Sequence, residues 1–325
     1  MVTIRDIAEK AGVSVATVSR VINNKKGVTE KTKRKVQQVI KNLNYKVDPI
    51  AVSLNNKRSK TIGLIMPDIT NPYFPELAKV IEKEAMAKGY NLIICNSDND
   101  ERLEKKQISL LEQKYIDGLI IASDLFEKSY LQRDIPVVVI DRITNHEFST
   151  VTVDNYNGAI EATEHLVNTG CKRIAHISGP PSVKTAQERL KGYREVVQKE
   201  SWFNESFIVN GEYNLDKAFN VTKDLLKNNS EIDGIFAGND LMGVGVLKLL
   251  YSLEKLVPDE ISVIGFDGIA FSKITNPELS TIAQPIKQIA LEATTILFNL
   301  IVDKHSNVFH KKLKTTFRQG ESTKH

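Results

Sequence analysis

Polar side chains that suit a small hydrophilic ligand follow several short apolar runs in the second part of the sequence. They lie at residues 68–74, 141–142, 239–240 and at Asp267. Planar side chains such as Asp, Asn and Arg can bridge adjacent hydroxyl groups, and aromatic rings can cover the apolar faces of a sugar ring. Each residue alone also suits a turn, a helix cap or a buried ion pair. The prediction of a site for a neutral polyol therefore rests on their recurrence.

The apolar runs predict the framework that would bring these side chains together. They alternate with amphipathic helical stretches and lie at 62–66, 92–95, 118–122, 137–140, 174–177, 235–237 and 263–266. Continuously apolar runs indicate strands buried on both faces, and hence parallel sheets covered by helices. The length fits two doubly wound sheets, in which ligands bind beyond the carboxyl ends of the strands.

The charge is distributed unevenly along the chain. The first 60 residues contain 14 Lys and Arg against 4 Asp and Glu, a net charge of +10, whereas the remaining 265 residues carry 30 against 36, a net charge of −6. A small basic module on a mildly acidic body suggests a polyanion as the partner of that module. Charge alone does not separate DNA from RNA or an acidic lipid.

Two short helices joined by a tight turn are predicted at the start of the basic module. Thr3 is placed as the N-cap of the first helix, Gly12 suits its left-handed end, and Ser14 can cap the second. The apolar stripe of the first helix is Ile4, Ile7, Ala8 and Ala11. The second helix buries Val18, Val21 and Ile22. Its outer and N-terminal side then presents Val15, Ala16, Thr17, Ser19 and Arg20.

A third helix completes a minimal helical core. It starts at Thr29, and its apolar stripe is Val36, Val39, Ile40 and Leu43. In a helix-turn-helix the second helix enters the major groove, so we expect Arg20 to contact guanine. Phosphates would then be held by Lys31, Lys33, Arg34 and Lys35.

A short hinge helix is predicted after this module. Asp48 and Pro49 suit the N-cap and first position of a segment at 50–56. An isolated helix of about two turns is marginal in water, so we expect it to order only when it pairs with its dimer mate and is held against DNA. Leu54 would then be the apolar residue that wedges between base steps in the minor groove.

The segment from Thr3 to Asn23 resembles the DNA-binding signature of the lactose-repressor (LacI/GalR) family almost in full, and Leu54 falls on that family's intercalating hinge leucine. The resemblance runs from end to end of the chain. Together with the helix analysis it implies a set of DNA-binding residues: Thr3, Ser14, Val15, Ala16, Thr17, Ser19, Arg20, Asn23 and Leu54. Two positions depart from the family's pattern: Val52 stands where an arginine often precedes the hinge serine, and Gly27 stands where some members have a base-contacting side chain. These departures leave the operator sequence open.

The core resembles periplasmic ribose-binding proteins, whose fold the family shares, over nearly all of residues 61–290. The residues that match sugar-holding positions are Asn71, Tyr73, Phe74, Asp141, Arg142, Arg189, Tyr213, Asn239, Asp267 and Gln284. Tyr73 and Tyr213 stand where those proteins have phenylalanine, which admits an extra hydroxyl contact or narrows the pocket. The match favours ribose, with a related pentose or hexose as the alternative. Two carboxylates facing the cleft would repel a sugar phosphate.

These observations predict an α/β protein with an N-terminal all-α helix-turn-helix domain at 1–46, a hinge helix and linker at 47–59, and a core at 60–325. The core is expected to resemble a periplasmic binding protein, with two doubly wound parallel-sheet subdomains. The N-subdomain would take about 60–158 and 288–318, and the C-subdomain about 159–287 and 319–325. We expect a homodimer on double-stranded operator DNA, with ribose closing the cleft, melting the hinge helices and lowering DNA affinity.

Other function classes lack their sequence signals. There is no Gly-x-Gly-x-x-Gly, phosphate-binding loop or Gly-x-Ser-x-Gly elbow, and the six histidines show no metal or triad pairing. We therefore predict a regulator and not an enzyme, without a metal or cofactor, and with Cys95 and Cys171 as reduced thiols. With no apolar segment of 18 residues and no export signal, a cytoplasmic location is expected over a membrane or exported transport protein.

Two other effectors stay open within the same DNA-binding architecture. One is a catabolite-control type of regulator, in which a phosphorylated carrier protein docks on the core as corepressor. The other is a repressor that responds to a purine, which reverses the sign of the response.

Overall fold

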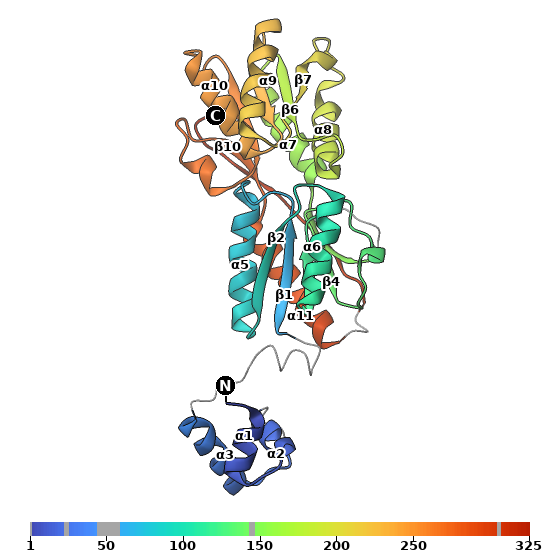
Figure 1. Ribbon diagram of the computed structural model, residues 1–325. Coiled ribbons are helices and arrows are strands. Elements are labelled where there is room, and N and C mark those ends of the chain that lie inside the picture. The colour runs from blue at the N-terminus through green and yellow to red at the C-terminus, as the bar shows by residue number, and fades with distance from the viewer. Residues whose placement is uncertain (1, 23–25, 44–58, 143–146, 304–306) are drawn as a thin grey trace. The chain divides into compact units, whose positions relative to one another are not determined.

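The computed structural model describes residues 2–22, 26–43, 59–142, 147–303 and 307–325. It divides into two compact units, Met1–Ser59 and Lys60–His325 (Figure 1). The predicted hinge segment, with Leu54, and the predicted DNA contact Asn23 lie outside the described residues. None of the helices in the described ranges is long and apolar enough to cross a membrane.

The first unit contains the predicted helical region. Its helices are α1 (Ile4–Ala11), α2 (Val15–Ile22) and α3 (Glu30–Asn42). Thr3 caps α1 in a reciprocal capping box with Asp6, and Gly12 ends the helix in the left-handed conformation, with φ of 60°. A small core joins the three helices and buries Ile7, Ala8, Ala11, Val18, Val21 and Val36. The prediction of an all-α N-terminal module is confirmed.

The second unit begins with the N-subdomain, which is built on a parallel six-stranded sheet of order β11-β5-β4-β3-β1-β2. Its strands are β1 (Thr61–Met66), β2 (Asn91–Asn96), β3 (Gly118–Ile121), β4 (Val137–Ile140), β5 (Ser149–Val153) and β11 (His310–Leu313). Its helices are α5 (Tyr73–Ala87), α6 (Glu101–Gln113), η1 (Lys128–Tyr130) and α11 (Ile286–Val302). The strand order changes direction between β1 and β3, and in such sheets a crevice forms there at the carboxyl ends of the strands.

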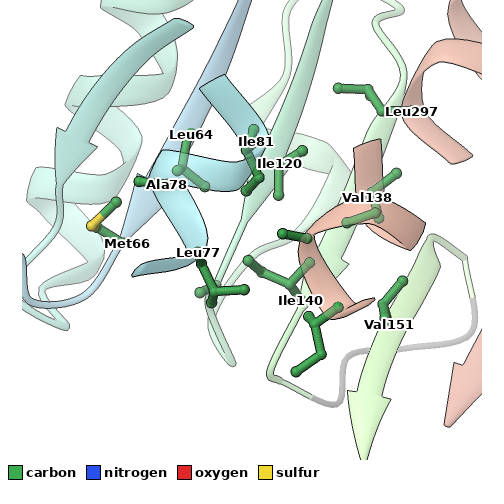
Figure 2. Close-up of a cluster of buried hydrophobic side chains, with 14 of the residues drawn as sticks. Leu64, Met66, Leu77, Ala78, Ile81, Ile120, Val138, Ile140, Val151 and Leu297 are labelled. Carbon is green, nitrogen blue, oxygen red and sulfur yellow. The ribbon is translucent and has the colours of Figure 1, made fainter. Parts of the chain in front are cut away.

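Helices cover both faces of this sheet. On one face α5 and α11 pack against alternate residues of the central strands, and Figure 2 shows Leu77, Ile81 and Leu297 with Ile120 and Val138 of the sheet. On the other face α6 packs against the intervening residues, with Ile108 and Leu111 in the second cluster. Burial on both faces explains the continuous apolar runs of the central strands β1, β3 and β4.

The C-subdomain repeats this plan. Its sheet has the order β12-β10-β9-β8-β6-β7, parallel except for β12 against β10. The strands are β6 (Ile174–Ser178), β7 (Ile208–Asn210), β8 (Gly234–Ala237), β9 (Ser262–Asp267), β10 (Ser280–Ala283) and β12 (Thr316–Arg318). The helices are α7 (Asn155–Asn168), α8 (Lys184–Val197), η2 (Glu205–Phe207), α9 (Leu215–Asn228), α10 (Asp240–Ser252) and η3 (Ala270–Lys273). One face is covered by α7 and α8, the other by α9 and α10.

The chain passes between the two subdomains three times. The passages follow β5, which ends at Val153, β10, which ends at Ala283, and β11, which ends at Leu313. Each lies a few residues earlier than the expected boundaries near 158, 288 and 318. The last differs because β12 pairs with β10 and so belongs to the C-subdomain. The two doubly wound parallel-sheet subdomains themselves are as predicted.

Candidate functional site between the two subdomains

A small polar cavity lies where the carboxyl ends of strands from both sheets meet. It is lined by Asn71, Tyr73, Phe74, Asp141, Arg142, Thr185, Arg189, Tyr213, Asn239 and Asp267. Its volume of about 30 Å³ is close to that of one water molecule, so the surrounding side chains contact one another across the cleft. Five of the ten come from the N-subdomain and five from the C-subdomain.

Arg189 is the central cation of the C-subdomain side. It projects from α8 and is almost completely buried. Its Nη1 lies 3.2 Å from Oδ1 of Asp267 and donates to the carbonyl oxygen of Gly238 at 2.7 Å, while its Nε donates to Oδ1 of Asn155 at 2.9 Å. Its guanidinium carbon lies 3.8 Å from the ring centroid of Phe266. These contacts hold the guanidinium in one orientation, with its carboxylate partner facing the cavity.

Arg142 is the corresponding cation on the N-subdomain side of the cavity. It follows β4 and is 4% exposed, and its Nε lies 3.5 Å from Oδ2 of Asp141. Its Nη1 donates to Oγ1 of Thr185 in α8 at 3.1 Å, which joins the two subdomains, and lies 3.7 Å from Oδ2 of Asp124. The cavity therefore contains two arginines, each beside a carboxylate, which is a paired arrangement suited to adjacent hydroxyl groups.

A series of hydrogen bonds connects the aromatic residues at the start of α5 to Asp267. Asn71 accepts from the backbone N–H of Tyr73 at 3.2 Å, and the rings of Tyr73 and Phe74 form an edge-to-face pair with centroids 5.1 Å apart. The hydroxyl of Tyr73 donates to Oε1 of Gln284 at 3.0 Å, and Nε2 of Gln284 donates to Oδ1 of Asp267 at 2.7 Å. Gln284 thus positions two residues of the cavity although it does not line it.

Three residues that line the cavity have a left-handed backbone. The φ angles are 61° at Asp141, 55° at Tyr213 and 113° at Asp267. Non-glycine residues in such conformations typically cost of order 1 to 3 kcal/mol each and cluster at functional sites. At Tyr213 the ring also packs on Gly179, where an added Cβ would lie 2.3 Å from the ring. Three residues that face the cavity therefore carry this backbone strain.

Burial sets the protonation of two carboxyl groups near the cavity. Burial raises the pKa of Asp267 to about 6, with Arg189 opposing the shift. Behind the cavity, Asp240 is completely buried, and its burial together with the charge of Asp267 raises its pKa to about 8. Asp240 accepts from the backbone N–H of Ile269 at 2.9 Å and from the Thr281 hydroxyl at 2.5 Å. At neutral pH Asp267 is mainly ionised and Asp240 is mainly protonated.

The structure brings the predicted ligand residues together. Nine of the ten line the cavity, and the tenth, Gln284, hydrogen bonds to two of them. Thr185 also lines the cavity and was not predicted, because it lies in the first turn of α8 and not directly after a strand. The sequence feature that could have identified Thr185 is the loop at 179–183, which follows β6 and leads into α8. Asn155, which holds Arg189, was not predicted either.

Seven of the nine predicted DNA-binding residues are among those that the structure describes, and these lie in the first unit. Val15, Ala16 and Arg20 of α2 are exposed, and Thr17 and Ser19 are half-buried. Ser14 accepts from the backbone N–H of Thr17 at 3.1 Å, which caps α2. Thr3 caps α1 and is exposed. The start of α2 therefore presents small and polar side chains, as expected of a helix that enters a groove.

Comparison with known proteins gives consistent matches over the whole chain. Residues 3–48 match the family model of bacterial regulatory proteins, lacI family. Residues 59–319 match the model of periplasmic binding proteins and the sugar binding domain of the LacI family. The chain is 41% identical over 325 residues to the ribose operon repressor of Halalkalibacterium halodurans, with 100% of this chain and 98% of that protein covered.

Two solved structures show the same fold. A LacI family transcriptional regulator from Enterococcus faecium with bound ribose has a TM-score of 0.73 and 26% identity, covering 81% of this chain and 98% of that one. The Lac repressor dimer bound to operator and an anti-inducer has a TM-score of 0.87 and 24% identity, covering 100% and 99% of the two chains. The second likeness carries information on the fold alone.

Proposed function

This chain belongs to the LacI family of bacterial regulatory proteins, whose members bind DNA as transcriptional repressors, and we propose that D-ribose is the effector that releases it from operator DNA. The observation that carries the proposal is the cavity between the two subdomains. There, Asp141 and Arg142 face Arg189 and Asp267, beside the aromatic rings of α5.

The chemistry of this cavity favours a neutral sugar. Arg142 and Arg189 donate to hydroxyl oxygens, and Asp141 and Asp267 accept from hydroxyl hydrogens, so each pair can hold two neighbouring hydroxyls of one ring. Phe74 and Tyr213 supply apolar faces for the ring carbons. The relative that is named a ribose operon repressor and the ribose-bound regulator support ribose among the neutral sugars.

The size of the cavity implies that binding is coupled to motion. At about 30 Å³ it is too small for a pentose, so the subdomains must open for a sugar to enter. A ligand that contacts both subdomains then favours the closed form over the open one, which is the differential affinity that allosteric control requires. We infer a cytoplasmic homodimer without catalytic activity, in which each chain contributes one α2 to a pseudo-palindromic operator.

A direct test measures both sites on the full-length protein. An operator is first selected from a random duplex library, and DNA binding is then followed by fluorescence anisotropy while D-ribose is added. We expect D-ribose to release the DNA and to bind in calorimetry with one site per chain. Ribose 5-phosphate should bind much more weakly, because its phosphate would face Asp141 and Asp267.

Two results would contradict the proposal. One is DNA affinity that does not change at saturating D-ribose. The other is stronger DNA binding with hypoxanthine or guanine, which would make the protein a purine-dependent repressor. Binding of a phosphorylated carrier protein that strengthens the DNA complex would likewise point to the catabolite-control type.

A further inference from the structure

The helix that carries Thr185 and Arg189 has no cap of its own. The N-cap residue of α8 is Val183, whose side chain accepts no hydrogen bond. Four other helices of the core, α6, α7, α9 and α10, are capped within their own subdomain by Asp100, Asp154, Asn214 and Asn239, whereas α5 and α11 follow prolines and have no side-chain cap. The first N–H groups of a helix need acceptors, and an apolar N-cap is among the least favourable choices.

The missing acceptor comes from the other subdomain. Asp124 follows β3 in the N-subdomain, and its Oδ2 accepts from the backbone N–H of Lys184, the first residue of α8, at 3.2 Å. Asp124 does not line the cavity. Burial raises the pKa of its carboxyl group against the pull of Arg142, so holding it there carries a desolvation cost. The contact with α8 and the more distant Arg142 are what offset that cost.

A second contact of the same kind lies near Asp267. The short helix η3 follows Ile269, whose side chain also accepts no hydrogen bond. Oε1 of Glu76, from α5 of the N-subdomain, accepts from the backbone N–H of Ala270 at 2.8 Å. Two carboxylates of one subdomain thus accept from two backbone N–H groups of the other. Both donors lie close in sequence to residues that line the cavity, Lys184 beside Thr185 and Ala270 three residues after Asp267.

We propose that Asp124 and Glu76 are positioning residues for effector binding: they tie the closed subdomains together by accepting backbone hydrogen bonds across the cleft, without touching the effector. Opening the cleft breaks both contacts and leaves α8 without its acceptor. Asp124 contributes more to effector binding than Glu76, because its partner helix α8 carries Thr185 and Arg189. This inference rests on the proposed role of the cavity.

The test compares variants that separate hydrogen bonding from charge. Asp124→Ala removes the acceptor, whereas Asp124→Asn keeps an acceptor oxygen and removes only the charge near Arg142. From the usual worth of a helix cap, we expect Asp124→Ala to raise the dissociation constant for D-ribose about tenfold and Asp124→Asn less than about threefold. Glu76→Ala should raise it about threefold, with Glu76→Gln close to the original protein.

Two controls distinguish a tie between subdomains from ordinary helix stability. Asp100→Ala removes a carboxylate cap within the N-subdomain, and should lower the melting temperature without changing D-ribose affinity. Val183→Thr, added to Asp124→Ala, gives α8 a cap of its own, and should restore the melting temperature but not the affinity. Equal dissociation constants for Asp124→Ala and the original protein, equal losses for the Ala and Asn variants, or full rescue by Val183→Thr would overturn the proposal.

A measurement on the free protein keeps this inference separate from the identity of the effector. If the original protein does not bind D-ribose, the proposed effector is wrong. The role of the Asp124 contact is then tested by measuring the distance between the two subdomains. Spin labels at Lys106→Cys and Lys223→Cys, both exposed positions, are used with Cys95 and Cys171 replaced by serine. The proposal requires Asp124→Ala to lengthen this distance relative to Asp124→Asn, and identical distance distributions overturn it.

Discussion

The hydroxyl of Tyr73 donates a hydrogen bond of 3.0 Å to the side-chain oxygen of Gln284, a residue 211 positions away in the chain. Tyr73 begins α5, and Gln284 lies at the second passage between the subdomains. Both side chains are buried. The bond therefore links the first turn of a helix that lines the cavity to the segment between β10 and α11, which joins the two subdomains.

Removing that hydroxyl should weaken the protein measurably. Tyr73→Phe leaves Oε1 of Gln284 buried without its donor, and we expect unfolding free energy to fall by about 1 to 2 kcal/mol. The matched control is Tyr213→Phe, because the hydroxyl of Tyr213 is buried with no hydrogen-bond partner among the described residues. Urea unfolding should show a loss for the first variant and none for the second, and equal effects would contradict the assignment.

Effector binding should weaken in mild acid. Burial raises the pKa of Asp267 to about 6, so the carboxylate that accepts from a sugar hydroxyl is lost as the pH falls through that value. Between pH 7 and pH 5 the ionised fraction falls about tenfold, and the D-ribose affinity should fall by about the same factor. Asp267→Asn should bind weakly at every pH and leave operator binding intact. Calorimetry at several pH values checks both, and a pH-independent affinity would count against Asp267.

Stability should depend on pH through Asp240. Its pKa in the folded protein is about 8, above the ordinary value of 3.8, so the folded state retains a proton that the unfolded chain releases. The contribution of this group to the unfolding free energy is fully present below about pH 4. It is lost as the pH rises toward 8, by up to about 1.4 kcal/mol per pH unit. In Asp240→Asn the amide oxygen can still accept from the Ile269 N–H and the amide NH2 can donate to the Thr281 hydroxyl oxygen, and the group no longer titrates. The unfolding free energy of this variant should therefore decline less between pH 6 and 8. Parallel pH curves for the two proteins would refute this.

Two substitutions in the first unit should separate base reading from phosphate binding. Arg20→Ala, on α2, should cost about 1 to 3 kcal/mol at the selected operator and relax base preference. Lys33→Ala, on α3, should weaken binding to every duplex and reduce the salt dependence by about one counterion. Lys106→Ala, on the exposed face of α6, serves as the control. Anisotropy titrations at several salt concentrations measure these effects, and identical behaviour of the first two variants would contradict the assigned roles.

The strands buried on both faces were predictable from the sequence. All seven apolar runs are strands. Six of them are buried on both faces, which demands apolar side chains at successive positions, whereas the seventh, β2, is a partly exposed edge strand. The strand β5 reads Ser-Thr-Val-Thr-Val, and β11 reads His-Lys-Lys-Leu, so neither forms an apolar run. Strands β7 and β12, at the edges of the second sheet, are only three residues long and carry too little pattern to be recognised.

Part of the site was predictable from positions at strand ends, since Asp141 directly follows β4 and Asp267 is the last residue of β9. The resemblance to ribose-binding proteins added Arg189, Tyr213 and Gln284. Thr185 and Asp124 were not predicted, because one lies in a helix and the other acts through a backbone group 60 positions away. Every residue except proline has a backbone N–H, so the sequence gives no sign of which residue donates one to Asp124. The role of Asp124 therefore becomes visible only when both subdomains are in place.

The last two strands of the chain, β11 and β12, are separated by two residues and complete different sheets. During synthesis the ribosome makes these strands after all the others described, so neither half of the core can gain its final edge strand until nearly the whole polypeptide has emerged. A nonsense mutation shortly after α11 would therefore damage both halves together, and would not leave one intact domain beside one lost.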